Sequence, residues 1–405
     1  MQSFHTADEA EIRAGATTDI YFRHTEEVLR QRGLLERRAH AEVTTGGLPE
    51  NWPWGVLCGL DEALSLLEGR EVDIDALPEG TLFPARDRRG RRIPVLTLEG
   101  PYGAYCIYET PLLGFLCQAT GVATRAARIR LAAGDASVLS FGARRMHPAI
   151  APMIDRAAWV GGCDGISCIL SAERLGITPT GTMPHALMIL FEDQAEAWRA
   201  FDETMPPEVP RIALVDTYWD EKAEAIIAAE TLGEALYGVR LDTPGSRRGN
   251  FVDIVREVRW ELDLRGFNHV RIFVSGSLDE KVIPALAAAG AVGFGVGTHL
   301  SNAPTVDFAL DIVSLEGAPV AKRGKLSGRK QVYHCSGCGE WEVDLREMPP
   351  PACPGCDTPM RPMLRRWLDG GRRTAPTPSP TEIREYVLRQ LSGATLDGSP
   401  VSRGR

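Results

Sequence analysis

Residues 211–217, RIALVDT, form a short apolar run that ends in polar residues, and three later segments repeat this layout. They are GVRLDT at 238–243, VRIFVSG at 270–276 and VGFGVGT at 292–298. Apolar stretches typical of helices separate them, such as EKAEAIIAAETLGEAL after the first. A repeated order of strand, polar end and helix is typical of the βα units of a parallel barrel. We therefore predict a parallel, TIM-like α/β barrel.

The polar ends of these strands predict a ligand site. The carboxyl ends of parallel barrel strands meet on one face, where such barrels build their sites. Carboxylates there can bind ribose hydroxyls or a metal ion, and the backbone N–H groups of glycine and serine can bind phosphate oxygens. A sugar phosphate would suit this mixture, although the two aspartates could also simply cap the helices that follow. The candidate residues are Asp216, Arg240, Asp242, Ser275, Gly276, Gly297 and Thr298.

Length and composition limit the other possibilities. The chain has 405 residues, of which 44% are hydrophobic and 24% charged, so we expect an ordinary globular protein of two or three domains. A net charge of −9 argues against a general nucleic-acid binder but not against a small anionic ligand. The acidic start of the chain does not read as a signal peptide, and the longest apolar run, residues 285–297, is too short to span a bilayer. We therefore expect a cytoplasmic protein with no membrane or nucleic-acid partner.

We predict three parts of the chain. Residues 1–112 form an N-terminal α/β domain, with helices at 3–14 and 26–40 and a hairpin at 80–98 that turns at 87–90. Residues 113–305 form the barrel, and residues 306–405 form a C-terminal segment. In that segment Ser379 and Glu382 make a capping box with Pro380 at the first helical position, which predicts a helix to about Leu391.

Four of the nine cysteines have the spacing of a metal site. Cys335 and Cys338 form one CxxC pair, Cys353 and Cys356 form another, and 14 residues separate the pairs. Two such turns can direct four thiolates at one point, so we predict a closed, four-cysteine zinc knuckle at residues 335–356 with structural Zn²⁺. The five other cysteines lie in apolar surroundings and are expected to be buried, reduced thiols.

Three further motifs precede these strands. TDIYF at 18–22 is near the N-terminus, SFGARR at 140–145 follows a predicted strand, and PTGTMPH at 179–185 is placed at the end of another. Taken singly, each has a structural interpretation. Tyr21 and Phe141 would be core aromatics, Arg144 would be solvated, and His185 would be a hydrogen-bonded structural residue.

Taken in order, the motifs FGARR, GTMPH, LVDT, RLDT, VSG and GVGT resemble the nicotinate phosphoribosyltransferase family, over residues 18–330. The cysteine motif is similar to that of the archaeal-type members. The resemblance implies a type II phosphoribosyltransferase fold with an irregular, TIM-like α/β barrel, in which C-terminal segments complete the N-terminal domain. It also implies a homodimer, or a higher oligomer, with active sites shared between subunits.

The implied reaction joins nicotinate to phosphoribosyl pyrophosphate, coupled to ATP hydrolysis and assisted by Mg²⁺. By resemblance, His185 is the histidine that ATP phosphorylates, and Asp216 acts through Mg²⁺. Arg240 would pair with the nicotinate carboxylate through its planar fork. The remaining substrate-binding residues follow from the same resemblance. They are Tyr21 and Phe141 stacked on the ring, Thr182 in contact with nicotinate, Arg144 on the pyrophosphate or the carboxylate, Asp242 on the ribose, and Ser275, Gly276, Gly297 and Thr298 on the 5′-phosphate.

Other functions remain open at this point. A nicotinamide enzyme would need an acidic residue facing the amide, for which Asp164 is the candidate, and a quinolinate enzyme would need more basic residues and no ATP. An aldolase-type barrel would need a lysine at a strand end, and none of the five lysines is predicted there. A nucleic-acid-binding zinc ribbon would use the arginines of residues 361–373 around Trp367.

Overall fold

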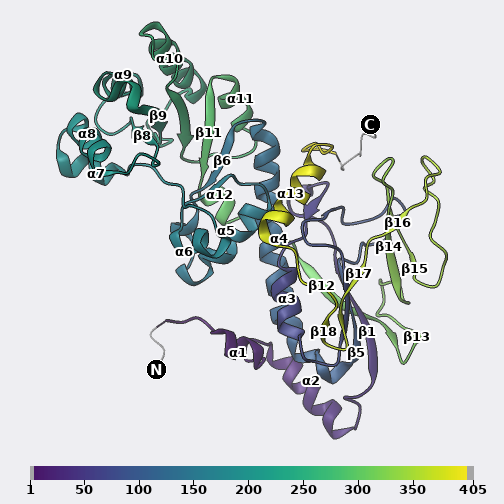
Figure 1. The fold of residues 1–405 in the computed structure, drawn as a ribbon. Coiled ribbons are helices and arrows are strands. Elements are labelled where there is room, and N and C mark those ends of the chain that lie inside the picture. Colours follow the sequence, from purple (N-terminus) through teal and green to yellow (C-terminus); the bar gives the residue numbers. More distant parts are fainter. Residues whose placement is uncertain (1–3, 399–405) are drawn as a thin grey trace. The chain divides into compact units, whose positions relative to one another are not determined.

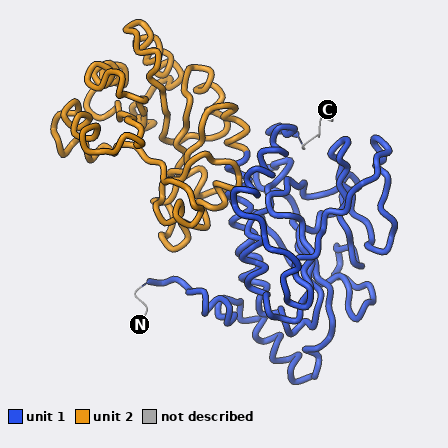
Figure 2. Tube along the Cα trace, in the orientation of Figure 1, with its two compact units in different colours: residues 1–127, 304–405 blue, residues 128–303 orange. Residues whose placement is uncertain are grey.

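The computed structural model describes residues 4–398, and the chain divides into two compact units (Figure 2). Unit 1 combines residues 1–127 with residues 304–405, and unit 2 comprises residues 128–303. One long helix, α4 (Glu109–Ala133), runs across both the unit boundary and the predicted domain boundary at residue 112. The predicted three-part division of the chain therefore stays a prediction.

Unit 1 is built on a seven-stranded sheet to which both ends of the chain contribute (Figure 1). Its order is β13-β12-β1-β5-β3-β17-β18, and the pairs are antiparallel. Strand β1 lies between β5 and β12, and all but its first residue are buried. The strands are β1 (Arg38–Thr45), β3 (Asp73–Ala76), β5 (Leu96–Pro101), β12 (Phe308–Leu315), β13 (Ala318–Pro319), β17 (Arg365–Asp369) and β18 (Arg372–Arg373).

Smaller elements surround this sheet. Strand β14 pairs with β15 and β16, and β2 pairs with β4. The core of the unit includes Val43, Leu64, Phe83, Leu98 and Leu368. The elements are β2 (Gly55–Val56), β4 (Leu82–Phe83), β14 (Lys330–His334), β15 (Trp341–Leu345), β16 (Arg361–Pro362), α1 (Glu9–Arg13), α2 (Ile20–Gln31), α3 (Leu60–Leu67) and α13 (Pro380–Leu391).

Unit 2 contains the predicted βα repeats, in a six-stranded parallel sheet of order β7-β6-β11-β10-β9-β8. The four segments of the opening motif form β8, β9, β10 and β11, as predicted. Within residues 4–398 the edge strands β7 and β8 do not pair, so the barrel is a curled half-barrel rather than a closed ring. The strands are β6 (Ser137–Ser140), β7 (Gly165–Ile166), β8 (Arg211–Leu214), β9 (Leu236–Leu241), β10 (Arg271–Ser275) and β11 (Ala291–Val296).

The glycines of β11 allow aromatic rings to pack against that strand. A Cβ on Gly295 would lie 2.4 Å from Cδ2 of Phe141, and one on Gly293 would lie 2.4 Å from Cδ1 of Phe273. Real Cβ atoms do not approach so closely, and only glycine fits at both positions. The alternation VGFGVG is therefore a packing pattern for two phenylalanine rings.

Helices connect the strands of unit 2. Helix α9 begins after Asp220, whose carboxylate accepts a hydrogen bond from the N–H of Ala223 at 2.9 Å. Helix α6 ends at Gly176, which has φ of +69°. The helices are α5 (Ala151–Val160), α6 (Ile169–Leu175), α7 (His185–Phe191), α8 (Gln194–Thr204), α9 (Glu221–Leu232), α10 (Phe251–Leu264), α11 (Ile283–Ala288) and α12 (Thr298–Ser301).

Predictions for the local elements had mixed outcomes. The capping box of Ser379 and Glu382 is confirmed, and so is the turn at 87–90, where the N–H of Asp87 donates to the carbonyl of Arg91. The predicted helix 26–40 is wrong beyond Gln31, because Gly33 has φ of +67° and the chain enters β1 at Arg38. The predicted hairpin is confirmed next to its turn, where Arg86 and Arg92 form an antiparallel bridge, but it does not extend to β4, which pairs with β2 instead.

Across residues 4–398, we find no helix with the length and apolar character needed to cross a bilayer.

Candidate active site

The parallel sheet of unit 2 brings the predicted strand-end residues to one edge. Asp216 follows β8, Asp242 follows β9, Gly276 follows β10 and Gly297 follows β11. Because β8, β9, β10 and β11 are parallel neighbours, these residues come from the same end of four adjacent strands.

Arg240 is the centre of a hydrogen-bond network at this edge. Its Nη1 donates to Oγ of Ser275 at 2.9 Å and lies 3.3 Å from a carboxylate oxygen of Asp242. Its Nη2 donates to the carbonyl of Met183 at 2.9 Å. Ser275 in turn donates to Asp242 at 2.7 Å, which closes a three-residue ring of contacts. Arg240 is 8% exposed, so the guanidinium is fixed before any ligand arrives.

The carbonyl of Met183 connects this network to the GTMPH motif. Residues 179–184 form no strand, which corrects the prediction that the motif ends one. Pro179 and Pro184 lack the N–H that a ladder needs, so the segment stays irregular. His185 is instead the first residue of α7.

His185 and Asp216 form the second contact of the site. Nε2 of His185 lies 3.2 Å from Oδ1 of Asp216. The Asp216 side chain is 2% exposed while that of His185 is 38% exposed, so the imidazole lies between a buried carboxylate and solvent. Neither oxygen of Asp216 has a well-formed hydrogen bond within the described part of the chain.

Burial dominates the electrostatics of this carboxylate. It raises the pKa of Asp216 to about 6. The neighbouring His185 and Arg240 oppose the increase, whereas the negative charge of Asp242 adds to it. Asp216 is therefore a buried acid that can change charge near neutral pH, as functional carboxylates often do.

Glu224 holds the loop after Asp216, a role that the sequence did not indicate. Its carboxylate accepts hydrogen bonds from the backbone N–H groups of Thr217 at 2.9 Å and of Tyr218 and Trp219 at 2.6 Å. The residue is fully buried on the first turns of α9. Burial raises the pKa of Glu224 while the three N–H groups lower it. Glu224 thus fixes the loop that directly follows Asp216.

The turn after β10 has the backbone shape expected of an anion-binding loop. Gly276 has φ of +88° and Ser277 has φ of +52°, so a serine adopts the left-handed conformation that a second glycine would adopt more easily. Arg248, which sequence reasoning also missed, donates through Nη1 to the carbonyl of Gly276 at 2.9 Å. A positive charge therefore lies beside this turn.

Another group of residues that the sequence did not indicate lies beside Thr298. His299 contacts Glu280 through Nε2 at 2.8 Å, and Nε of Arg128 lies 3.3 Å from the same carboxylate. Thr298 itself is exposed at the start of α12. The short α12 also packs against the loop after β6, because a Cβ on Gly142 would lie 2.6 Å from Cβ of Ser301.

The other predicted residues are less closely connected. Phe141 is partly buried with its ring over Gly295, and Arg144 is exposed in a 3-10 turn. Thr182 is partly buried two residues after Thr180, whose N–H donates to the carbonyl of Ile166. Tyr21 is on α2 of unit 1 with 56% of its surface exposed. The structure places Tyr21 within unit 1 alone.

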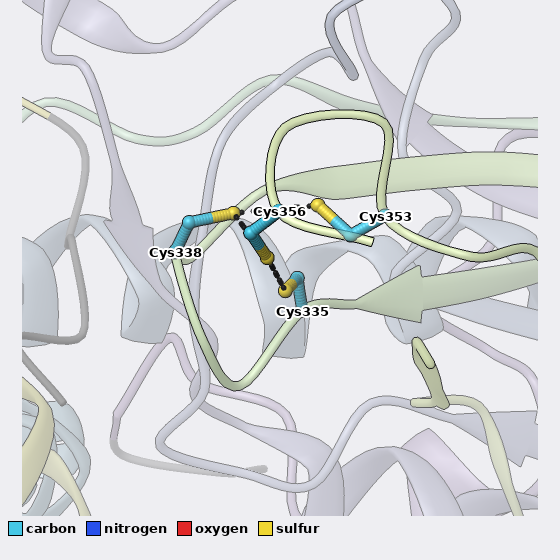
Figure 3. Close-up of side chains that lie close together, drawn as sticks. All are labelled: Cys335, Cys338, Cys353 and Cys356. Atoms are coloured by element: carbon cyan, nitrogen blue, oxygen red, sulfur yellow. Dashed lines mark hydrogen bonds between the residues drawn. The ribbon is translucent and has the colours of Figure 1, made fainter. Parts of the chain in front are cut away.

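The four predicted cysteines meet at one point (Figure 3). Their sulfur atoms lie within 4.8 Å of one another, with Cys335 and Cys356 at 3.4 Å and Cys338 and Cys353 at 3.3 Å. These separations are far above the roughly 2.05 Å of a disulfide. They are close to the roughly 3.8 Å between thiolates around tetrahedral zinc. The group could hold a metal ion, and its chemistry fits Zn²⁺.

Two arginines that follow the cysteine cluster in the sequence have structural roles. Arg366 pairs with Asp75 at 2.7 Å, and Arg373 pairs with Asp61 at 2.8 Å. Trp367 is buried and donates through Nε1 to the carbonyl of Ala76 at 3.2 Å. Trp367, Arg366 and Arg373, which a nucleic-acid-binding zinc ribbon would use, are therefore part of the unit 1 sheet.

Comparisons with known proteins agree with this fold. Family models of quinolinate phosphoribosyl transferase match residues 19–120 with their N-terminal domain and residues 122–311 with their C-terminal domain. Nicotinate phosphoribosyltransferase pncB2 of Mycobacterium tuberculosis is 35% identical over 353 residues, which cover 82% of this chain and 71% of that protein.

Two solved structures are also similar. The crystal structure of nicotinate-nucleotide pyrophosphorylase from Pyrococcus furiosus is 53% identical, with a TM-score of 0.93 over 97% of this chain and 98% of that chain. Human nicotinic acid phosphoribosyltransferase shares the fold, with 23% identity and a TM-score of 0.74 over 93% of both chains. The half-barrel and its N-terminal domain thus define a type II phosphoribosyltransferase. The chain belongs to the nicotinate phosphoribosyltransferase family.

Proposed function

We propose that this enzyme transfers the phosphoribosyl group of phosphoribosyl pyrophosphate to nicotinate, giving nicotinate mononucleotide and pyrophosphate in NAD salvage. The ring nitrogen of nicotinate attacks C1 of the ribose while the bond from C1 to pyrophosphate breaks. Positive charge develops on the ribose ring in the transition state. The protein must therefore hold a flat anion, position the ribose and exclude water.

The observation that supports the acid as substrate is the buried Arg240. A guanidinium has five N–H donors in one plane, and here two nitrogens are held by Ser275, Asp242 and Met183. Its Nε has no partner within residues 4–398. A rigid, partly satisfied guanidinium is suited to a planar carboxylate.

Nicotinamide fits this site less well. Its neutral amide would favour a free carboxylate, and Asp164 was the candidate. Asp164 instead pairs with Nη1 of Arg130 at 2.5 Å and accepts from the N–H of Val138 at 2.9 Å. The Asp164 carboxylate is therefore bonded to Arg130 and to the backbone of β6.

Quinolinate is the second candidate, because the matching family models carry its name. Its two carboxylates would need more positive charge than Arg240 alone. Arg144 and Arg248 are the candidates to supply it. The resemblance of the GTMPH motif favours nicotinate, since the histidine that ATP phosphorylates in that family, which His185 matches, would have no role in a reaction without ATP.

We assign the remaining roles from position at the strand ends and from the family resemblance. Asp242 would hold the ribose hydroxyls, and the turns at Ser275–Gly276 and Gly297–Thr298 would hold the 5′-phosphate. Thr182, Phe141 and Arg144 would contact the ring or the pyrophosphate. His185 would accept a phosphoryl group, and Asp216 would orient its imidazole.

Mg²⁺ fits this arrangement through Asp216. Its carboxylate is buried without a well-formed hydrogen bond in the described residues, and Mg²⁺ prefers carboxylate oxygens together with substrate phosphates. When bound, the ion would neutralise phosphate charge. Zn²⁺ would be held by Cys335, Cys338, Cys353 and Cys356, with a structural role because four protein ligands leave no open position.

A homodimer is proposed from the family resemblance and from helix α2. Three large apolar side chains on this helix are exposed, Ile20 by 66%, Tyr21 by 56% and Val28 by 59%. A second subunit would cover them, and Tyr21 would then reach the partner's nicotinate. The cytoplasmic location stays a prediction.

The proposed role of Arg240 is tested by substrate preference. Arg240→Gln should lower kcat/KM for nicotinate by about 10- to 100-fold, the range for losing a charge-assisted hydrogen bond pair, and should affect nicotinamide far less. Arg256→Gln, on the exposed face of α10, is the control. An unchanged preference for acid over amide in Arg240→Gln would remove Arg240 from the carboxylate site.

A further inference from the structure

A cavity in unit 1 lies between the cysteine-bearing strands and helix α13. Its volume is about 570 Å³, within the range of small-molecule sites. We name it the arginine pocket. Its lining residues are Thr81, Leu82, His334, Ser336, Trp341, Arg361, Pro362, Met363, Arg365, Tyr386, Arg389, Gln390, Ser392 and Gly393. All belong to unit 1, whereas the candidate active-site residues around Arg240 belong to unit 2.

The lining of the arginine pocket is positively charged without compensation. It includes Arg361, Arg365 and Arg389 but no aspartate or glutamate, in a chain whose net charge is −9. Within residues 4–398 these three arginines form no ion pair, whereas their sequence neighbours Arg366 and Arg373 both do. All three arginines are exposed and line the same pocket. Guanidinium groups without carboxylate partners favour an anionic ligand, and phosphate suits their fork geometry.

Aromatic side chains line another part of the same pocket, with His334 and Tyr386 partly exposed and Trp341 5% exposed. The rings of His334 and Trp341 lie 4.7 Å apart at an angle of 48°. Tyr386, Met363 and Leu82 complete this part of the lining. Planar ligands gain by stacking and by burial against such side chains.

Helix α13 is hydrogen-bonded to residues 80–82, of which Thr81 and Leu82 also line the pocket. Oε1 of Gln390 accepts from the N–H of Leu82 at 3.0 Å, and its Nε2 donates to the carbonyl of Gly80 at 2.9 Å. The capping box of Ser379 and Glu382 fixes the start of the same helix. These hydrogen bonds fix α13 against residues 80–82, so two adjacent lining segments of the pocket are held in place before a ligand binds.

We propose that the arginine pocket binds a free nucleotide, with the phosphate on the three arginines and the base near His334, Trp341 and Tyr386. A zinc ion held by four thiolates keeps a net negative charge, and offsetting it is the competing role for Arg361. That role requires no ligand and no saturable binding, so the two are separable by experiment.

The test uses the full-length, zinc-loaded protein and the photoaffinity probe 8-azido-AMP, with labelled peptides located by mass spectrometry. We expect saturable labelling of peptides that contain His334, Trp341 or Tyr386. AMP should compete for it and adenosine should not. The double variant Arg361→Ala with Arg389→Ala should weaken labelling by about tenfold or more, because charge-assisted contacts to phosphate are lost.

The control carries the same change of charge at exposed positions of unit 2, Arg256→Ala with Arg265→Ala, and should label like the unmodified protein. Zinc content and melting temperature verify that each variant is folded. Absence of labelling in these peptides, equal labelling of the double variant, or equal competition by adenosine would overturn the proposal. So would displacement by a short single-stranded oligoribonucleotide at far lower concentration than AMP, since the ligand would then be a nucleic-acid chain.

Discussion

The imidazole Nε2 of His185 lies 3.2 Å from the buried Oδ1 of Asp216. A carboxylate that holds one ring nitrogen fixes the orientation of the imidazole. In the role that we propose for His185, the other nitrogen, Nδ1, would accept the phosphoryl group. The pair joins the first residue of α7 to the end of β8, so its geometry depends on two separate βα units.

The first prediction concerns the pH dependence of stability. The pKa of Asp216 is raised from its ordinary value near 4 to about 6, so the native state binds the proton more tightly than the unfolded chain. The neutral carboxyl is favoured, and stability is lost as pH rises from about 4 through about 6. Asp216→Asn stays neutral and avoids this loss. Relative to the unmodified protein, its unfolding free energy should rise by on the order of 2 kcal/mol over that range.

Chemical denaturation at several pH values measures this difference. Asp253→Asn, at a position 62% exposed on α10, is the matched control and should show no such trend. A difference between Asp216→Asn and the unmodified protein that stays constant with pH would contradict the raised pKa.

The second prediction concerns ATP. His185→Ala should eliminate both the stimulation of the reaction by ATP and any acid-labile phosphorylation of the protein, while leaving some activity without ATP. Phosphate analysis after incubation with labelled ATP and initial rates with and without ATP provide the two measurements. His269→Ala, exposed before β10 at the other end of the sheet, should behave normally. Persistent ATP stimulation in His185→Ala would disprove the role.

The third prediction concerns Glu224 as a positioning residue. Glu224→Gln places an amide N–H₂ group against backbone N–H groups. This removes some of the hydrogen bonds that the Glu224 carboxylate accepts from residues 217–219. We expect a loss of about 1–3 kcal/mol in stability for a poorly satisfied buried polar group. We also expect a fall in kcat larger than any change in KM for nicotinate, because the loop sets the position of Asp216.

Glu230→Gln, exposed on the same helix, is the control for this experiment. If Glu224→Gln lost stability but kept its kcat, Glu224 would be a structural residue only.

The fourth prediction concerns the cysteine cluster. Cys353→Ser should reduce bound zinc to well below one equivalent and lower the melting temperature, because four thiolates form the site. Cys117→Ser, a cysteine of unit 1 outside the cluster, should keep its zinc. Metal analysis of the purified proteins distinguishes them, and full metal content in Cys353→Ser would refute the site.

Much of unit 2 was predictable from the sequence, because each βα unit is a local pattern. Apolar runs that end in Asp216, Asp242 or Gly276 specify buried parallel strands, and adjacent parallel strands bring those ends together. The cysteine cluster was predictable for the same reason, since each CxxC turn is local. The capping box at Ser379 depends only on residues three apart.

The features that were missed depend on tertiary contacts. No local signal shows that the carboxylate of Glu224 turns back onto its own loop, or that Arg248 reaches the carbonyl of Gly276. Helix 26–40 was extended too far because the apolar pattern continues past Gly33 into a strand that β12 and β5 stabilise. The open edges of the half-barrel depend on β7 and β8, which the repeat itself does not distinguish from neighbouring strands.

The most direct test of the account is the product formed when the purified protein receives phosphoribosyl pyrophosphate with equal amounts of nicotinate, nicotinamide and quinolinate. We predict nicotinate mononucleotide and pyrophosphate in equal amounts from nicotinate, with faster turnover when ATP is present. Nicotinamide mononucleotide as the main product, or carbon dioxide released from quinolinate as the main reaction, would contradict the assignment of Arg240 and His185.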